Sequence, residues 1–322
     1  MATKTIKDIA THKPSLSSSP HIHSDLSVKK SMWYVIYALI PAVVSAVIFF
    51  GFYQLVVIGV AVAFSMLTEF VIKKFRKQAA TLWDGSAIIT GLLLGLILPP
   101  NFSLVFTALG AIVGIGLGRE IFGGLGFNVF NPALVGRAFL QAAFPVQMTT
   151  WTKTNLAVDS VSSATPLASF KFDGISTELT KMFFGNTGGC LGETSGIAIL
   201  IGGIFLMATT VVNWRIPVAM IAGVLIFSGI FWVIDPAQFQ NPLFHLFGGG
   251  FLFAAFFMAT DWVSSPITKR GMWIFGLGIA LVLVLIRLFG GLPEGVMYSI
   301  LLLNAFVPLI NKYTKPKVFG VN

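Results

Sequence analysis

Long apolar runs alternate with short polar segments over most of this chain, and their lengths are close to those that cross a lipid bilayer. A membrane-spanning helix needs about 20 predominantly apolar residues. Ten runs near this length can be recognised, at 33–51, 54–72, 86–98, 103–118, 128–143, 196–211, 215–234, 243–260, 272–289 and 295–311. The pattern predicts an all-α integral membrane protein with about ten transmembrane helices. Several runs are short or interrupted by Gly and Pro, which is typical of broken or tilted helices.

The composition agrees with a membrane location. Of the 322 residues, 56% are hydrophobic and 10% are charged, and the mean hydropathy is +0.87. A soluble domain carries roughly 25% charged residues, so this chain has too few to cover a water-facing surface. Its single cysteine, Cys190, excludes a disulfide framework. No cysteine or histidine spacing indicates a metal site, and the polar first thirty residues do not resemble a signal peptide.

The excess of basic residues is explained by membrane topology rather than by nucleic-acid binding. The net charge is +9, with 21 Lys and Arg residues. Sixteen of these fall on one side of the predicted spans and four on the other, while Arg137 lies within a span. Because Lys and Arg accumulate on the cytoplasmic side, we expect both termini to be cytoplasmic. The predicted order is a tail (1–30), five helices (31–143), an extracytoplasmic loop (144–195), five helices (196–311) and a tail (312–322).

The two groups of five helices are related by an internal repeat. The tetrapeptide FGGL occurs at 122–125 and again at 289–292, an offset of 167 residues. Two further matches keep the same offset, Arg137-Ala-Phe-Leu with Asn304-Ala-Phe-Val and Pro99 with Pro266. Because five is an odd number, the two halves must be inverted relative to each other in the membrane. Inverted repeats are typical of transporters, so the architecture alone favours a solute channel or secondary transporter.

The stretch NVFNPALVGRAF, residues 128–139, carries polar groups inside the fifth predicted span. Asn131 followed by Pro132 predicts a helix start, with Asn as N-cap and Pro at the first helical position. A helix N-terminus offers backbone N–H donors and a positive dipole end, which can hold an anion or the carbonyl edge of a ring system. Ordinary capping and ligand binding both remain open for Asn128 and Asn131.

Charged residues within spans need partners. Arg137 is costly in the membrane unless it is paired, so it is either an ion-pair residue or part of a binding site. Glu69 and Lys73 are four residues apart at the predicted edge of the membrane, and we interpret them as a surface ion pair.

The loop stretch DSVSSATPLA, residues 159–168, is polar and rich in small residues. Pro166 disfavours the α region for Thr165 and predicts an extended backbone there. We expect the threonine hydroxyl to be accessible to a modifying enzyme on the extracytoplasmic side. The residues alone support a modification site only weakly.

The D-x-x-S/T-G/S-A-T pattern resembles the acceptor motif of the periplasmic flavin transferase, which links FMN through its phosphate to the last threonine. Further blocks resemble the RnfD/NqrB family, and the GNTGGCLGETS block and compact length are most like its RnfD branch. These blocks are DGSAIITGLLLGLILPP (84–100), FGGLGFNVFNPALVGRAFL (122–140), GNTGGCLGETS (185–195), FFMATDWVSSPITKRG (256–271) and PEGVMYSILLLNAFVPLI (293–310).

The resemblance implies cofactors and their residues. Covalent FMN maps onto Thr165, with Asp159, Ser162, Ser163 and Ala164 as the attachment motif; Ser163 stands where the family usually has Gly. A second, noncovalent flavin, riboflavin, is associated with the family, and we place it near Asn128, Asn131 and Arg137. The family's ten-helix fold in two inverted halves agrees with the pattern counted above. Trp151 and Phe170 could stack on a flavin or act as ordinary interfacial anchors.

The implied function is a flavoprotein subunit of the Rnf complex in the cell membrane, relaying electrons between ferredoxin and NAD⁺ with coupled Na⁺ or H⁺ translocation. Implied partners are a second covalent-FMN subunit (G), membrane subunits A and E, iron–sulfur subunits B and C, and the flavin transferase. We expect no catalytic acid–base residues, and no complete activity from this chain alone. The alternatives are the B subunit of the sodium-pumping NADH:quinone reductase, an inverted-repeat transporter, and a scaffold with an unused motif.

Overall fold

The computed structural model describes residues 27–78, 81–151, 164–185 and 187–316, and within these ranges it is helical with no strand. The first half of the chain forms α2 (Val28–Phe50), α3 (Tyr53–Phe75), η1 (Leu82–Asp84), α4 (Ser86–Leu96), α5 (Leu104–Gly118), η2 (Glu120–Phe122) and α6 (Pro132–Ala143). Three short helices follow, α7 (Pro145–Met148), α8 (Pro166–Asp173) and α9 (Leu179–Phe184). The second half forms α10 (Gly196–Ala208), α11 (Arg215–Ile234), α12 (Pro242–Phe247), α13 (Phe251–Phe253), the π-helix η3 (Ala254–Met258), α14 (Lys269–Phe289) and α15 (Val296–Thr314).

Six helical segments of the described chain are long and apolar enough to cross a bilayer: Val28–Phe50, Tyr53–Phe75, Leu104–Phe122, Arg215–Ile234, Lys269–Phe289 and Val296–Thr314. Two further apolar helices, α4 and α10, are shorter. The predicted run at 128–143 contains the 12-residue α6, and the run at 243–260 is broken into α12, α13 and the π-helix. The all-helical membrane class agrees with the prediction, whereas the count of ten spans stays a prediction.

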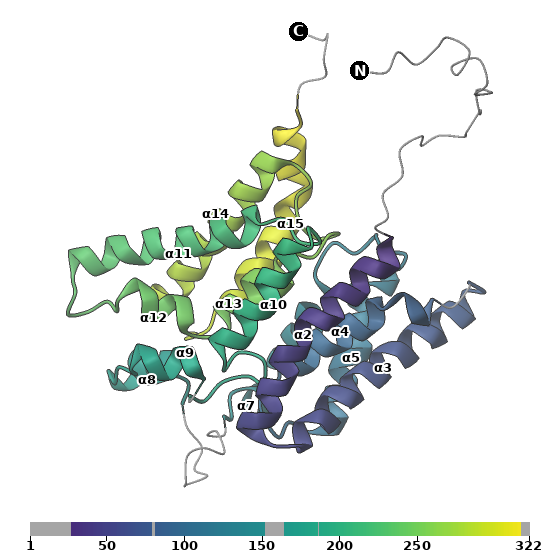
Figure 1. Cartoon of the computed structure of the whole chain (residues 1–322), viewed down its shortest axis with the longest axis horizontal. Coiled ribbons are helices and arrows are strands. Elements are labelled where there is room, and N and C mark those ends of the chain that lie inside the picture. The colour runs from purple at the N-terminus through teal and green to yellow at the C-terminus, as the bar shows by residue number, and fades with distance from the viewer. Residues whose placement is uncertain (1–26, 79–80, 152–163, 186, 317–322) are drawn as a thin grey trace, which may run out of the picture.

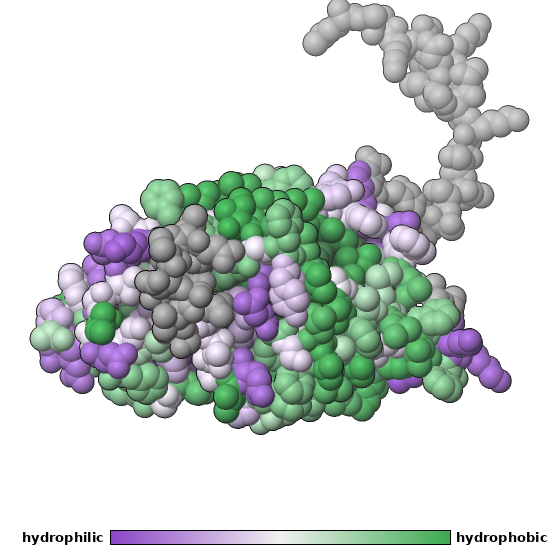
Figure 2. Space-filling model, turned by 90° about the horizontal axis from the view of Figure 1, so that it is seen from below, coloured by the Kyte–Doolittle hydropathy of each residue, from purple (hydrophilic) through white to green (hydrophobic). Residues whose placement is uncertain are grey.

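The outer surface is apolar, as contact with lipid requires. Large hydrophobic side chains are exposed along the long helices, for example Ile48 in α2, Val105 in α5 and Ile226 in α11. Figure 2 shows broad areas of hydrophobic residues on one face of the helical body, beside a group of hydrophilic ones. An exposed apolar surface of this extent is stable in hydrocarbon and not in water.

The packing of the first half recurs in the second. Helix α3 packs on α4 and α5, and α5 packs on α6; correspondingly, α11 packs on α12 and α14, and α14 packs on α15. The FGGL segments follow α5 and α14, so they occupy equivalent places. Arg137 and Asn304 lie in α6 and α15, the last helix of each half. This agreement supports the duplicated five-helix unit, and its inversion stays a prediction.

The two halves meet where α2 packs against α10 (Figure 1) and where α6 packs against α15. At the first contact the backbones approach closely: a Cβ on Gly202 of α10 would lie 2.1 Å from the Ala38 carbonyl oxygen of α2. Small residues allow this approach, which maximises van der Waals packing between membrane helices.

The ends of the long helices define two sides of the molecule. In Figure 1 the first turn of α2 and the last turn of α15 lie at the top, and α7, α8 and α9 lie at the bottom. The segment 164–184, which carries Thr165, is therefore on the side opposite to the outer ends of α2 and α15. This placement fits the predicted topology; which side faces the cytoplasm stays a prediction.

Candidate functional site

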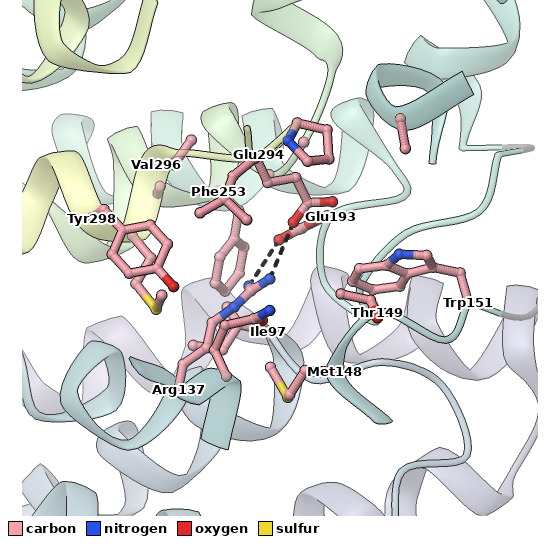
Figure 3. Close-up of a pocket in the computed structure, with 18 of the residues that line it drawn as sticks. Ile97, Arg137, Met148, Thr149, Trp151, Glu193, Phe253, Glu294, Val296 and Tyr298 are labelled. Carbon is pink, nitrogen blue, oxygen red and sulfur yellow. Dashed lines mark hydrogen bonds and ion pairs between the residues drawn. The ribbon is translucent and has the colours of Figure 1, made fainter. Parts of the chain in front are cut away.

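A cavity of about 590 Å³ lies between the two halves, near the end that carries α7 and α8 (Figure 3). Its polar groups come from α6, from the segment after α7, and from the two loops that precede α10 and α15. The wall includes three charged residues and three of their neighbours: Arg137, Glu193, Glu294, Trp151, Ala164 and Gly250. Apolar side chains such as Ile97, Phe253 and Val296 form much of the remaining wall.

Arg137 projects from α6 toward two carboxylates (Figure 3). Its Nη1 lies 3.3 Å from Glu193 Oε1, and its Nη2 lies 3.3 Å from Glu294 Oε2. The guanidinium is nearly buried, with 10% of its side chain exposed. A buried cation is tolerated because each donor group faces an opposite charge. The expectation that Arg137 needs a partner is confirmed.

Glycines at the start of α13 make room for this cluster. Gly250 has a φ of +65°, a conformation that glycine adopts at no steric cost. A Cβ on Gly250 would also lie 2.2 Å from Glu193 Oε1. Arg287 of α14 reaches the C-terminal end of α12, where its guanidinium donates hydrogen bonds to the carbonyl oxygens of His245 and of Gly248 just after the helix. The loop 248–250 thus accommodates a carboxylate and a guanidinium against bare backbone.

Two titratable groups of this cluster lie outside the long helices. Burial, followed by the negative charge of Glu193, raises the pKa of the Glu294 carboxyl, although Arg137 and Arg287 oppose the shift. Burial also raises the pKa of the Cys190 thiol, which is fully buried. Cys190 is therefore a protonated packing residue rather than a reactive thiolate.

Thr165 precedes α8 and caps it. Its backbone is extended, with φ −64° and ψ 155°, as the following proline predicts, and its Oγ1 accepts a hydrogen bond of 3.3 Å from the Ala168 N–H. The expectation of an accessible hydroxyl is wrong, because Thr165 is 2% exposed. Ala164 lines the cavity, whereas Asp159, Ser162 and Ser163 lie outside the described residues.

Helix α8 is held in place by one lysine and one small apolar cluster. The Lys171 ammonium donates to the carbonyl oxygens of Arg287 (2.9 Å), Leu292 (3.2 Å) and Gly290, at the C-terminal end of α14 and just beyond it. A cation there also complements the helix dipole. Leu167 packs with Met182 of α9 and Phe244 of α12.

The two aromatic residues near this segment differ in place. Phe170 packs edge-on against Phe244 and belongs to the apolar cluster, so it is not in the cavity wall. Trp151 lines the cavity and is 7% exposed. Stacking on a ligand therefore remains open for Trp151 alone.

A second cavity, of about 360 Å³, lies at the other end of α6 and includes Asn128 and Asn131 in its wall. Asn131 is the N-cap of α6: its Oδ1 accepts from the N–H groups of Ala133 and Leu134. Its Nδ2 donates to the Met258 carbonyl oxygen at 3.1 Å. The capping interpretation is confirmed, and the same amide also joins the two halves.

Asn128 faces the second cavity with a carboxylate beside it. Its Nδ2 lies 3.3 Å from Asp261 Oδ2 and 3.1 Å from the Phe130 carbonyl oxygen. Burial raises the pKa of Asp261. Arg137 does not line this cavity, so grouping it with the two asparagines was wrong. Arg137 lies on the same helix as Asn131 but six residues further on, and its side chain enters the first cavity.

A buried charge cluster lies beside the second cavity. Arg119 Nη2 is 2.6 Å from Glu69 Oε2 and Nε is 3.1 Å from Glu120 Oε1, while Lys73 pairs with Glu69 Oε1. The 2.6 Å contact is an ion pair but not a hydrogen bond, since Arg119 Nη2 and Glu69 Oε2 have no hydrogen-bond partner among the described residues. Glu69 is fully buried and Lys73 is 7% exposed. The expected ion pair between Glu69 and Lys73 is confirmed, but its expected surface position is wrong, because both residues are buried.

The comparisons with known proteins match nearly the whole chain. Residues 15–320 match the model of the NQR2, RnfD, RnfE family. This chain belongs to that family. It is 45% identical over 316 residues to the D subunit of the proton-translocating ferredoxin:NAD(+) oxidoreductase complex of Clostridium ljungdahlii, covering 95% of this chain and 96% of the relative. It is 41% identical to the D subunit of the Na(+)-translocating ferredoxin:NAD(+) oxidoreductase complex of Acetobacterium woodii, covering 95% of each. It is also 37% identical to the D subunit of the ion-translocating oxidoreductase complex of Actinobacillus succinogenes, covering 95% of this chain and 97% of the relative.

The sequence did not identify Glu193, Glu294 and Arg287 as part of the charged cluster at the first cavity. A signal was present, because the chain has only 12 Asp and Glu residues. In such a chain, an acidic residue that borders an apolar span and folds into the membrane needs a buried cation or a water-filled cavity. Nothing in the sequence showed which cation each carboxylate would meet.

Proposed function

We propose that this chain is the membrane flavoprotein subunit of an ion-translocating ferredoxin:NAD⁺ oxidoreductase complex. The observation that carries the proposal is the near full-length match to relatives that are named as the D subunit of that complex, at 45% and 41% identity. The chain then acts as part of an oxidoreductase and has no complete activity alone. The C. ljungdahlii relative is named for protons and the A. woodii relative for Na⁺.

The residues around Thr165 fit covalent FMN. Ala164, next to the proposed attachment point, lines a cavity whose volume is in the range of small-molecule sites. The Thr165 oxygen already accepts the Ala168 N–H, and an ester oxygen at this position can still accept it. A phosphate there would lie at the N-terminus of α8, where the helix dipole favours an anion. The apolar wall and Trp151 suit a flat aromatic ring.

The second cavity fits a noncovalent flavin, riboflavin in this proposal. It is mostly apolar and has a few polar groups, including Asn128, Arg119 and Asp261, as is typical of cofactor sites. Asn131 is committed to capping α6 and to the Met258 carbonyl, so it shapes the wall rather than offering free donors. Asn128 is the better candidate for a direct contact.

The two cavities are close neighbours along one wall. At the start of α6, Asn131 lines the second cavity, and Leu134, one turn further on, lines the first cavity. In the π-helix, Phe257 lines the second cavity and its neighbour Met258 lines the first. This arrangement supports an electron path between a flavin on the extracytoplasmic side and one on the cytoplasmic side. The flavins would supply the redox chemistry, while the protein fixes their positions and excludes water.

The proposed partners follow from this path. A second covalent-flavin subunit (G) delivers electrons at the Thr165 side; membrane subunits A and E, with iron–sulfur subunits B and C, handle ferredoxin, NAD⁺ and the coupled ion. A flavin transferase modifies Thr165, and lipid surrounds the ten helices, which form two inverted halves with both termini cytoplasmic.

In-gel flavin fluorescence of the denatured chain, co-expressed with the transferase, tests the cofactor assignment. We expect a fluorescent wild-type band and a dark Thr165→Ala band. The matched control is Thr150→Ala, because Thr150 lines the same cavity but lacks the motif; its band should stay fluorescent. A dark wild-type band with active transferase would contradict the assignment and favour the inverted-repeat transporter.

A further inference from the structure

Two carboxylates share one guanidinium at the wall of the first cavity. Glu193 and Glu294 each lie 3.3 Å from a different nitrogen of Arg137. The second cation nearby, Arg287, donates from Nη1 to the carbonyl oxygen of His245 in α12 and from Nη2 to that of Gly248 just after α12. The carboxylates therefore face each other across Arg137, and the negative charge of Glu193 disfavours ionisation of Glu294.

The two carboxylates differ in access. The Glu294 side chain is 20% exposed and the Glu193 side chain is 8% exposed. Glu294 lies in the segment between α14 and α15, next to Pro293 and Leu292 in the cavity wall. The Gly250 backbone packs directly against Glu193, so closely that a Cβ on Gly250 would clash with the carboxylate. Water in the cavity can reach Glu294 more easily.

We propose that Glu294 binds and releases a proton at the wall of the first cavity, with Glu193 and Arg137 setting the pH at which it does so. The step is an acid–base one. A Glu294 carboxylate oxygen accepts a proton from a hydronium ion, one O–H bond forms, and the hydronium ion leaves as water. No electron passes through this residue.

The charged and titratable groups around Glu294 give the direction of each contribution. Glu193, from the loop before α10, makes proton binding stronger, whereas Arg137 of α6 and Arg287 of α14 make it weaker. Cys190, from the same loop as Glu193, is a neutral thiol. Lys171 binds the Leu292 carbonyl two residues away. Burial of the carboxyl raises its pKa further, and it is the largest contribution.

A negative charge that enters the cavity would strengthen proton binding at Glu294 for the same reason that Glu193 does. If the cavity holds the redox flavin, reduction would draw a proton to this residue. This consequence rests on the proposed function, whereas the proton-binding site itself does not.

Infrared difference spectroscopy across a pH titration tests the site in the full-length Thr165→Ala chain in lipid nanodiscs, where no flavin can be attached. We expect the C=O band of a protonated carboxyl that persists above the ordinary pH range of glutamic acid and is lost in Glu294→Gln. In Glu193→Gln the band should titrate at lower pH, and in Arg137→Met it should persist to higher pH. The control is Glu178→Gln, since Glu178 is exposed on the same side of the molecule, and its spectrum should match that of the parent.

A parent spectrum without such a band, or a band whose intensity is unchanged in Glu294→Gln, would overturn the proposal. Glu294→Asp keeps a carboxyl if Glu294→Gln fails to fold, and its band should titrate at a different pH. A dark flavin gel together with an intact band would reject the cofactor assignment alone. In the assembled complex, the pH dependence of the flavin midpoint potential should become weaker in Glu294→Gln, and an unchanged dependence would remove the link to reduction.

Discussion

Glu69 provides the sharpest test of how buried charge holds the first half of this protein together. Its carboxylate meets Arg119 of the α5–η2 junction at 2.6 Å and also pairs with Lys73. The Thr81 hydroxyl donates to Glu69 Oε1 at 2.9 Å. Glu69→Gln keeps the size of the side chain and removes the charge, so two buried cations lose their shared counter-ion.

The expected loss of unfolding free energy is about 3–5 kcal/mol, the range for removing one partner of a buried ion pair. Since 1.4 kcal/mol corresponds to a factor of ten, the unfolded fraction should rise by roughly a hundredfold or more. The comparison is the exposed pair Glu178–Lys181, whose side chains are 67% and 57% exposed. Glu178→Gln should cost about 0.2–1 kcal/mol, because solvent screens that pair.

Denaturant titration in detergent micelles, followed by circular dichroism, measures both variants. The double variant Glu69→Leu with Arg119→Met should be less destabilised than the sum of its two single variants, because it leaves fewer unpaired charges. The reasoning is refuted if Glu69→Gln and Glu178→Gln lose the same free energy, or if the two single substitutions are additive.

Two further predictions concern the Thr165 segment and the topology. Thr165 is buried at the start of α8, and Lys171 holds that helix to the end of α14. Lys171→Met should therefore loosen α8 and increase the initial rate of flavin attachment, measured by an in-gel fluorescence time course, while Lys171→Arg should stay near the wild-type rate. A Lys171→Met rate no higher than wild type would show that docking of α8 does not limit access to Thr165. For the topology, Ile175→Cys and Tyr313→Cys place exposed thiols at opposite ends of the molecule, while the native Cys190 is fully buried. A membrane-impermeant maleimide should label Ile175→Cys in intact cells and Tyr313→Cys only after permeabilisation, and equal labelling of both in intact cells would reject the predicted orientation.

Local rules were sufficient where the determining atoms are close in sequence. The extended backbone of Thr165 and the start of α6 at Pro132 follow from steric limits around proline and from a side chain that reaches its own helix. The helical membrane class follows from run length and the scarcity of charge. The repeat was readable because equivalent positions keep identical residues, as with Phe139 in α6 and Phe306 in α15.

Tertiary structure decided everything that depends on which side chains meet. Spacing suggested that Glu69 and Lys73 lie on a surface, but α5 brings Arg119 over them and buries the pair. The polar, small-residue loop made Thr165 look accessible, yet the residue is buried where it caps α8.

The candidate site divides in the same way. Asn131 and Arg137 share one helix, yet that helix sends them into different cavities. Glu193 and Glu294 are far apart in the chain and meet at Arg137 because the loops before α10 and α15 converge there. The sequence by itself determined helix type, capping and the need of each buried charge for a partner. Only the tertiary structure decided which residue pairs with each buried charge, because this depends on the distances between segments that are far apart in the sequence.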